Sequence, residues 1–106
     1  YVDAKTIEIQ NVLPGRFSLS QNNPNPFNQN TMIPFDLARG SFVKLRIYNI
    51  LGQEVRLLKN EFLQTGYYSV PWYGKDQRGL SVASGIYIYR LETGKFIQSK
   101  KMLLIK

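Results

Sequence analysis

The sequence contains 106 residues, enough for one domain that buries a single hydrophobic core without covalent staples. It has no cysteine and no histidine, which excludes disulfide bonds, thiolate metal sites and catalysis by a histidine-containing triad. Fourteen lysine and arginine residues against seven acidic ones give a net charge of +7, which indicates either an anionic partner or a role in solubility alone. The basic residues are spread along the chain, which argues against nucleic-acid binding.

The first residues differ from the rest of the chain. Residues 1–14 show only weak alternation of apolar and polar side chains, around Ile7 and Ile9. We interpret them as a linker from an upstream domain, with one added strand as the alternative. The chain starts at Tyr1, and no apolar run reaches the roughly 18–20 residues that span a bilayer. We therefore expect a piece of a longer protein, in which residues 15–106 form one domain.

The first expected strands lie before residue 40. Phe17 and Leu19 alternate with polar residues, and the run 31–37 places four residues on one face: Thr31, Ile33, Phe35 and Leu37. Pro34 lies within this run and has no N–H group to donate to a neighbouring strand. We therefore expect this strand at a sheet edge or at a bulge.

The clearest alternation in the sequence covers residues 42–49. Val43, Leu45 and Ile47 face one way, while the residues between them are polar or aromatic, as in a half-buried strand. Residues 51–53 then predict a turn in which Gly52 adopts a positive φ, and residues 54–58 begin the hairpin partner.

The second half of the chain continues the pattern. Tyr68, Val70 and Trp72 share a face, and Trp72 is expected to be the largest core residue. Residues 74–79 predict a tight turn through their Asp and Gly residues. Residues 86–91 and 96–105 are the last two strands. The count is about seven strands in two sheets, which predicts an all-β sandwich.

Catalytic and cofactor chemistry is not expected. The acidic residues are scattered over turns and outward strand positions, without a pair that would separate two pKa values: Asp36, Glu54, Glu61, Asp76 and Glu92. No phosphate-binding glycine pattern or calcium loop is present. We predict no enzyme activity, no metal and no cofactor.

The order of motifs resembles a known family. The motifs are Phe17–Asn28, Ile33–Leu37, Leu45–Val55, Trp72–Asp76, Ser84–Leu91 and Lys100–Lys106. Together they are similar to the type A C-terminal sorting domain of the type IX (Por) secretion system of Bacteroidetes and related phyla. The resemblance covers residues 16–106 and implies an immunoglobulin-like β-sandwich of about seven antiparallel strands. One departure from the family lies in the loop 38–40.

The resemblance also implies a function and partners. Such a domain is a non-catalytic address label that directs an upstream cargo protein from the periplasm through an outer-membrane translocon. A sortase-like peptidase commonly removes it, near residues 1–15 here, and the cargo is released or attached to anionic lipopolysaccharide at the cell surface. The family motifs map onto the following recognition candidates: Gly52, Gln53, Val55, Gly85, Tyr87, Lys100, Lys101 and Lys106. Gly52, Gly85 and Tyr87 have packing or backbone roles as the alternative.

The run of Asn, Pro and Gln at residues 21–30 has a structural interpretation. Asn25 lies between Pro24 and Pro26, which restricts the segment to an extended connector. The Asn side chains are expected to satisfy backbone groups that such a loop leaves unpaired. Phe27 is expected to pack under the sandwich, with direct recognition by a partner as the alternative.

Two other functions remain open. The first is the related immunoglobulin-like domain of the flagellar hook-cap protein, which shares the elements around Trp72 and Gly85. The second is a carbohydrate-binding module that stacks sugars on exposed tyrosines, with Tyr48, Tyr67, Tyr73 and either Tyr87 or Tyr89 as candidates.

Two copies pairing through an exposed strand edge would give a dimer.

Overall fold

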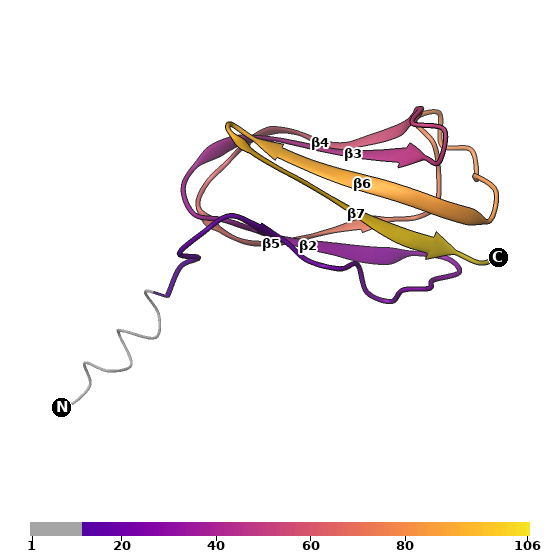
Figure 1. Ribbon diagram of the computed structural model, residues 1–106, viewed down its shortest axis with the longest axis horizontal. Coiled ribbons are helices and arrows are strands. Elements are labelled where there is room, and N and C mark those ends of the chain that lie inside the picture. Colours follow the sequence, from indigo (N-terminus) through magenta and orange to yellow (C-terminus); the bar gives the residue numbers. More distant parts are fainter. Residues whose placement is uncertain (1–11) are drawn as a thin grey trace.

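The computed structural model of the chain describes residues 12–106 as a sandwich of two antiparallel sheets, without a helix in this range (Figure 1). One sheet has the order β1-β2-β5 and consists of Ser18–Leu19, Thr31–Leu37 and Gly66–Trp72. The other has the order β4-β3-β6-β7 and consists of Glu54–Leu63, Ser41–Asn49, Gly85–Thr93 and Phe96–Leu104. The prediction of an all-β, immunoglobulin-like sandwich of seven strands is confirmed.

The alternating residues of β2 and β3 form the two inner walls of the core. Every second residue of β2, from Thr31 to Leu37, is inaccessible to solvent, and so are Val43, Leu45 and Ile47 of β3. Burying one such aliphatic or aromatic side chain contributes about 1.5–3 kcal/mol relative to leaving it exposed. The faces predicted for these two strands are therefore confirmed.

The predicted position of β2 at a sheet edge is wrong. β2 is the middle strand of its sheet, with Pro34 opposite Ser69 of β5. The carbonyl of Pro34 accepts a hydrogen bond from the Ser20 N–H at 3.0 Å on the β1 side. Because the N–H and C=O of one residue point the same way in an antiparallel ladder, the missing donor also faces the β1 side. The ladder on that side is already short, since β1 pairs at only Leu19 and Ser18.

The hairpin of β3 and β4 forms as predicted. Gly52 has a φ of +83° in the turn, where residues with a side chain are strained. The Asn49 side-chain carbonyl accepts hydrogen bonds from the N–H groups of Leu51 at 2.9 Å and Gln53 at 3.0 Å. This closes the turn from inside and sets where β4 begins.

Trp72 is the largest fully buried side chain, as predicted. Its ring meets the rings of Phe27 and Tyr87 edge-on, with centroids at 5.8 Å and 5.3 Å. Edge-to-face pairs at such separations add about 0.5–1.5 kcal/mol to the burial itself. Phe27 is 3% exposed, so its predicted core role is confirmed.

The Asn- and Pro-rich segment runs along the outer edge of β7. Phe27 donates its N–H to the Leu103 carbonyl at 3.0 Å and accepts the Ile105 N–H at 2.9 Å. The Leu103 N–H donates to the Asn25 side chain at 3.0 Å, and the Gln21 side chain donates to the Lys101 carbonyl at 2.7 Å. The Asn22 side chain donates to the Pro24 carbonyl at 3.2 Å, which confirms the expectation that Asn side chains satisfy backbone groups of the loop. The segment also covers the last third of an edge strand.

Tyr89 fastens the start of the same segment to the core. Its hydroxyl accepts the Asn22 N–H at 2.8 Å and donates to the Ser20 carbonyl at 2.7 Å. The ring is inaccessible to solvent, and burial raises the pKa of Tyr89 to about 12, although the Asn22 hydrogen bond acts in the opposite direction.

The predicted linker falls mostly outside the structure. Residues 1–11, including the weak alternation around Ile7, lie outside the described residues. Residues 12–14 form no strand, and Pro14 is already buried. The final strand ends at Leu104, one residue before the predicted end.

Candidate recognition surfaces

One end of the sandwich gathers most of the predicted recognition residues. Asn49 at the end of β3 pairs with Tyr87, so the turn with Gly52 and Gln53 lies beside the start of β6. Gly85 pairs with Leu104, and the Lys106 N–H donates to the Ser84 hydroxyl at 3.0 Å. In Figure 1 the tip of β3, the start of β6 and the C-terminus lie together at the right. We call this surface the turn end.

Two of the predicted residues are not surface contacts. Tyr87 is 7% exposed, and its hydroxyl donates to the Ala83 carbonyl at 2.6 Å. Burial raises the pKa of Tyr87, as expected for a phenol that packs against Trp72. Val55 is half-buried and packs against the core. Both side chains hold the turn end in shape and offer little to a partner.

The two adjacent lysines of β7 point to opposite faces of their sheet. Lys101 is exposed and lies opposite Ile88, whereas Lys100 is half-buried and lies opposite Tyr89, on the inner side. They therefore form no joint basic patch. Lys101 is available to an anionic partner, and Lys100 is partly occupied by packing.

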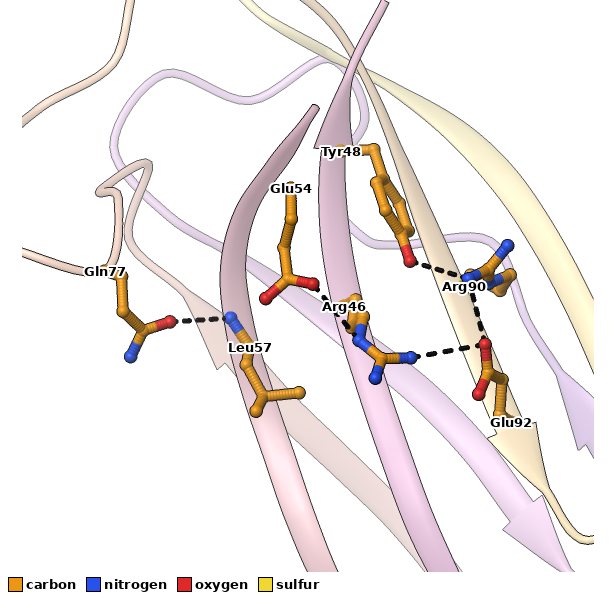
Figure 2. Close-up of polar contacts among 7 residues, drawn as sticks. All are labelled: Arg46, Tyr48, Glu54, Leu57, Gln77, Arg90 and Glu92. Atoms are coloured by element: carbon orange, nitrogen blue, oxygen red, sulfur yellow. Dashed lines mark hydrogen bonds and ion pairs between the residues drawn. The ribbon is translucent and has the colours of Figure 1, made fainter. Parts of the chain in front are cut away.

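The outer face of the four-stranded sheet carries a charged network that the sequence did not reveal (Figure 2). Arg46 bridges Glu54 and Glu92, at 3.2 Å each. Arg90 contacts Glu92 at 2.9 Å and donates to the Tyr48 hydroxyl at 2.7 Å, with its guanidinium 5.0 Å from the centre of that ring. The members come from three strands, and their proximity depends on the strand register.

The network is electrically balanced. Two guanidinium groups face two carboxylates, and each carboxylate lies within 3.2 Å of a guanidinium nitrogen. Partly exposed pairs of this kind contribute about 0–1 kcal/mol each. The network is neutral in itself, and neither of its two carboxylates is left unpaired. Within residues 12–106 no group of acidic residues is placed to hold a metal ion, and no helix suited to crossing a membrane is present.

The tyrosines proposed for sugar stacking do not form one platform. Tyr87 and Tyr89 are core residues, and Tyr48 packs under Arg90. Tyr67 and Tyr73 are 59% and 58% exposed. They lie six residues apart along β5 and its extension, roughly 20 Å in an extended chain. Within residues 12–106, neither has an aromatic partner with which to sandwich a sugar ring.

The loop between β5 and β6 covers part of the edge strand β4. The Gln77 N–H donates to the Val55 carbonyl at 3.0 Å, and the Gln77 side chain accepts the Leu57 N–H at 2.8 Å, as Figure 2 shows in part. Asp76 closes the loop as predicted, with its carboxylate accepting the N–H groups of Leu80 and Arg78. These bonds, the one from Leu80 foremost, lower the pKa of Asp76.

A sandwich of these seven strands, with a short edge strand β1 and partly covered edges on β4 and β7, is an immunoglobulin-like domain. Residues 22–95 match the sequence model of the FlgD Ig-like domain. The chain belongs to this family, which is the family of the flagellar hook-cap alternative. None of the curated proteins matches the sequence.

Two solved structures contain a similar domain. The crystal structure of dimeric latent PorU from Porphyromonas gingivalis matches with a TM-score of 0.66 at 18% identity, over 82% of this chain and 9% of that chain. The structure of PorZ, described as an essential bacterial surface component of the type-IX secretion system of the same organism, matches with a TM-score of 0.56 at 20% identity, over 84% and 12%. The chain spans about a tenth of either neighbour, and the likeness shows the fold.

Proposed function

We propose that the chain is a non-catalytic signal domain that directs a secreted cargo protein through the type IX secretion system across the outer membrane. The observation that carries this proposal is the likeness of its fold to parts of PorU and PorZ, the second of which is described as a surface component of that system. The order of motifs from Phe17 to Lys106 supports it as well. A signal domain of this kind needs a stable surface that the translocon can bind, and it needs no reactive group.

The partners follow from the same proposal. The outer-membrane translocon binds the folded domain during transit from the periplasm, and a sortase-like peptidase removes it afterwards. The cargo precedes the domain in the same chain and ends at the cell surface or in the medium. The turn end, with Gly52, Gln53, Gly85 and Lys106, and the exposed Lys101 are the recognition residues in this proposal.

A fusion experiment tests the proposal. Residues 1–106 are attached to the C-terminus of a periplasmic reporter in a host with a type IX system, and reporter activity is measured in the periplasm and outside the cell. We expect export that disappears when the translocon gene is deleted. A reporter that stays in the periplasm, with the domain folded as judged by protease resistance, contradicts the proposal.

Lysine variants test which surface is gripped. Lys101→Gln removes an exposed charge from β7, and Lys95→Gln removes one from the β6–β7 turn at the opposite end. We expect reduced export of the first variant and normal export of the second, since neither side chain supports the core. Equal export of both variants would show that Lys101 is not a recognition residue. The sorting function itself is tested by the fusion experiment.

The family match favours one other function. A FlgD Ig-like domain in this chain fits an assembly role in a flagellar hook cap. Under that alternative the purified domain promotes assembly of hook subunits and gives no export of the reporter. The two functions therefore predict opposite results in the same fusion host.

A further inference from the structure

A groove lies between the edge strands β4 and β5. It has a volume of about 360 Å³. Arg56, Leu58 and Lys59 of β4 line one side, and the other side is lined by β5 from Ser69 to Trp72 and by Tyr73 and Lys75, which follow it. This volume is at the lower end of the range of about 300–1,000 Å³ typical of ligand sites. The groove is separate from the turn end and from the network of Figure 2.

The charge of the groove has one sign. Three cationic side chains line it, and none of its lining residues is acidic. Arg56 is held in place by its bond to the Asp76 carbonyl at 2.6 Å, and the backbone at Lys75 is fixed by the indole N–H of Trp72 at 3.0 Å. Lys59 has a carboxylate partner in Glu61 at 3.1 Å, and this exposed pair is readily exchanged for another carboxylate.

The β5 wall of the groove also offers unpaired backbone groups. β5 pairs with β2 only, and Pro34 and Met32 of β2 direct their carbonyl groups away from β5. By alternation, Val70 and Tyr68 pair with β2, whereas Tyr67, Ser69 and Pro71 direct their groups outward. No residue in the range 12–106 bonds to these groups. Two N–H and three C=O groups are thus open, because Pro71 lacks a donor.

The other side of the sandwich is not equivalent. There β1 and β7 have Cα atoms within 8 Å of each other. A strand inserted between two others needs about 4.8 Å on each side, or roughly 10 Å in total. On the β4 and β5 side, the groove of about 360 Å³ provides open space beside the free edge of β5.

We propose that this groove binds an acidic, extended peptide segment of a partner protein. The segment adds a strand to the free edge of β5, and its carboxylates contact Arg56, Lys59 and Lys75. Main-chain bonds to Tyr67 and Ser69 supply affinity, and the cations select acidic side chains. Pro71 ends the ladder and fixes the register, because a partner carbonyl opposite it finds no donor. The inference rests on the proposed function. It adds a second recognition surface to the turn end and identifies acidic peptides as its ligands.

The probe is a nine-residue peptide of alternating glutamate and threonine, titrated into the isotopically labelled chain of 106 residues. We expect the amide signals of Tyr67 and Ser69 to shift on binding. The Lys59→Gln, Lys75→Gln double variant should bind about tenfold more weakly, from a factor of about three for each exposed charge pair. The matched control Lys95→Gln should bind like the wild type, and a peptide with glutamine for glutamate should bind at least tenfold more weakly than the glutamate peptide.

Backbone methylation of the peptide tests strand addition without changing the protein. Methyl groups on alternate amide nitrogens abolish binding when they lie on the side facing β5, and leave it intact when they lie on the other side. Equal effects of both methylation patterns, or equal loss in the Lys95→Gln control, overturn the proposal. Binding of polygalacturonate with no binding of the peptide also overturns it and assigns the groove to an anionic polysaccharide.

The export assay separates this inference from the proposed function. If the wild-type domain exports the reporter and the double variant exports it equally well, the groove is not a recognition site and the sorting function stands. If the wild-type domain fails to export the reporter while the peptide still binds, the sorting function fails and the groove stands as a peptide site.

Discussion

At the scale of single residues, three aromatic side chains hold the sandwich together across its layers. Trp72 of the three-stranded sheet contacts Tyr87 of the four-stranded sheet and Phe27 of the connecting segment. The Tyr89 hydroxyl adds hydrogen bonds to Asn22 and Ser20, so that the buried N–H and the carbonyl both have partners. These residues therefore determine where the connecting segment can lie, and with it the covered part of β7.

A glycine pair tests the backbone role of Gly52. Gly52→Ala places a side chain at a φ of +83°, whereas Gly15→Ala adds the same methyl group without a positive φ, and both sites have open space around a Cβ atom. We expect Gly52→Ala to lower the free energy of unfolding by about 1 kcal/mol and Gly15→Ala to leave it unchanged or raise it slightly.

Urea unfolding followed by tryptophan fluorescence measures both variants. Equal stability of the two contradicts the assignment. A Gly52→Ala variant that folds yet loses export would show that the turn end acts in recognition as well as in folding.

At the scale of the elements, both edges of the four-stranded sheet are covered near the turn end. Gln77 pairs with β4 at Val55 and Leu57, and the segment from Gln21 to Phe27 pairs with β7. Both covers combine backbone hydrogen bonds with bonds from side-chain amides. Exposed strand edges invite pairing with another chain, so these covers restrict where such pairing can occur.

Removing the covers should promote self-association. The double variant Asn25→Ala, Gln77→Ala leaves the N–H groups of Leu103 and Leu57 without their partners. We expect a higher fraction of dimer in analytical ultracentrifugation. Asn30→Ala removes an exposed amide that bonds to none of the described residues, and this control should behave like the wild type. A monomeric double variant at the same concentration would show that the remaining edge is blocked in another way.

The sequence predicts the elements well and their neighbours poorly. The alternation of Val43, Leu45 and Ile47 specifies a buried face, and Gly52 specifies a turn, because both effects are local. Pro34 led to the wrong prediction that β2 lies at a sheet edge. A missing N–H donor shows where a ladder is interrupted, and it does not show whether the strand is at the edge. The groove at Lys59 and Lys75 and the network around Arg46 depend on register and sheet order, which no local pattern encodes.

The network shows how a site can escape sequence analysis. Arg46 and Glu92 are far apart in the chain, and they meet because Lys44 pairs with Glu92 and Arg46 with Arg90 in adjacent strands. The residues predicted from the family motifs do not all lie at the surface, because burial also depends on sheet packing. Gly52 and Gly85 lie together at the turn end, whereas the Tyr87 side chain is buried in the core.

At the scale of the whole molecule, stability should vary little with pH around neutrality, because the chain has no histidine. On the alkaline side, Tyr89 keeps its proton up to about pH 12 in the folded protein, and an unfolded tyrosine loses it near pH 10. Deprotonation therefore favours the unfolded chain between these values. On the acid side, the lowered pKa of Asp76 gives a contribution that is present above about pH 4 and is lost as the pH falls through the lowered value.

Thermal melting across pH measures these limits. We expect a constant Tm between about pH 5 and pH 9, a fall below about pH 4, and a second fall between about pH 10 and pH 12. Tyr89→Phe should be less stable at neutral pH, since it leaves the Asn22 N–H without its acceptor, and its alkaline fall should be shallower. An alkaline fall of the same size in the variant would assign it to other tyrosines.

The bridge between Phe27 and Leu104 has a mechanical consequence. The two segments run parallel, so a tension that draws the N-terminal and C-terminal ends apart acts along both of them and across the bonds that join them. Bonds loaded in this direction slide and break together, whereas an antiparallel hairpin pulled at its open end unzips one bond at a time. Resistance to pulling therefore concentrates where the proline-rich stretch lies beside the end of β7.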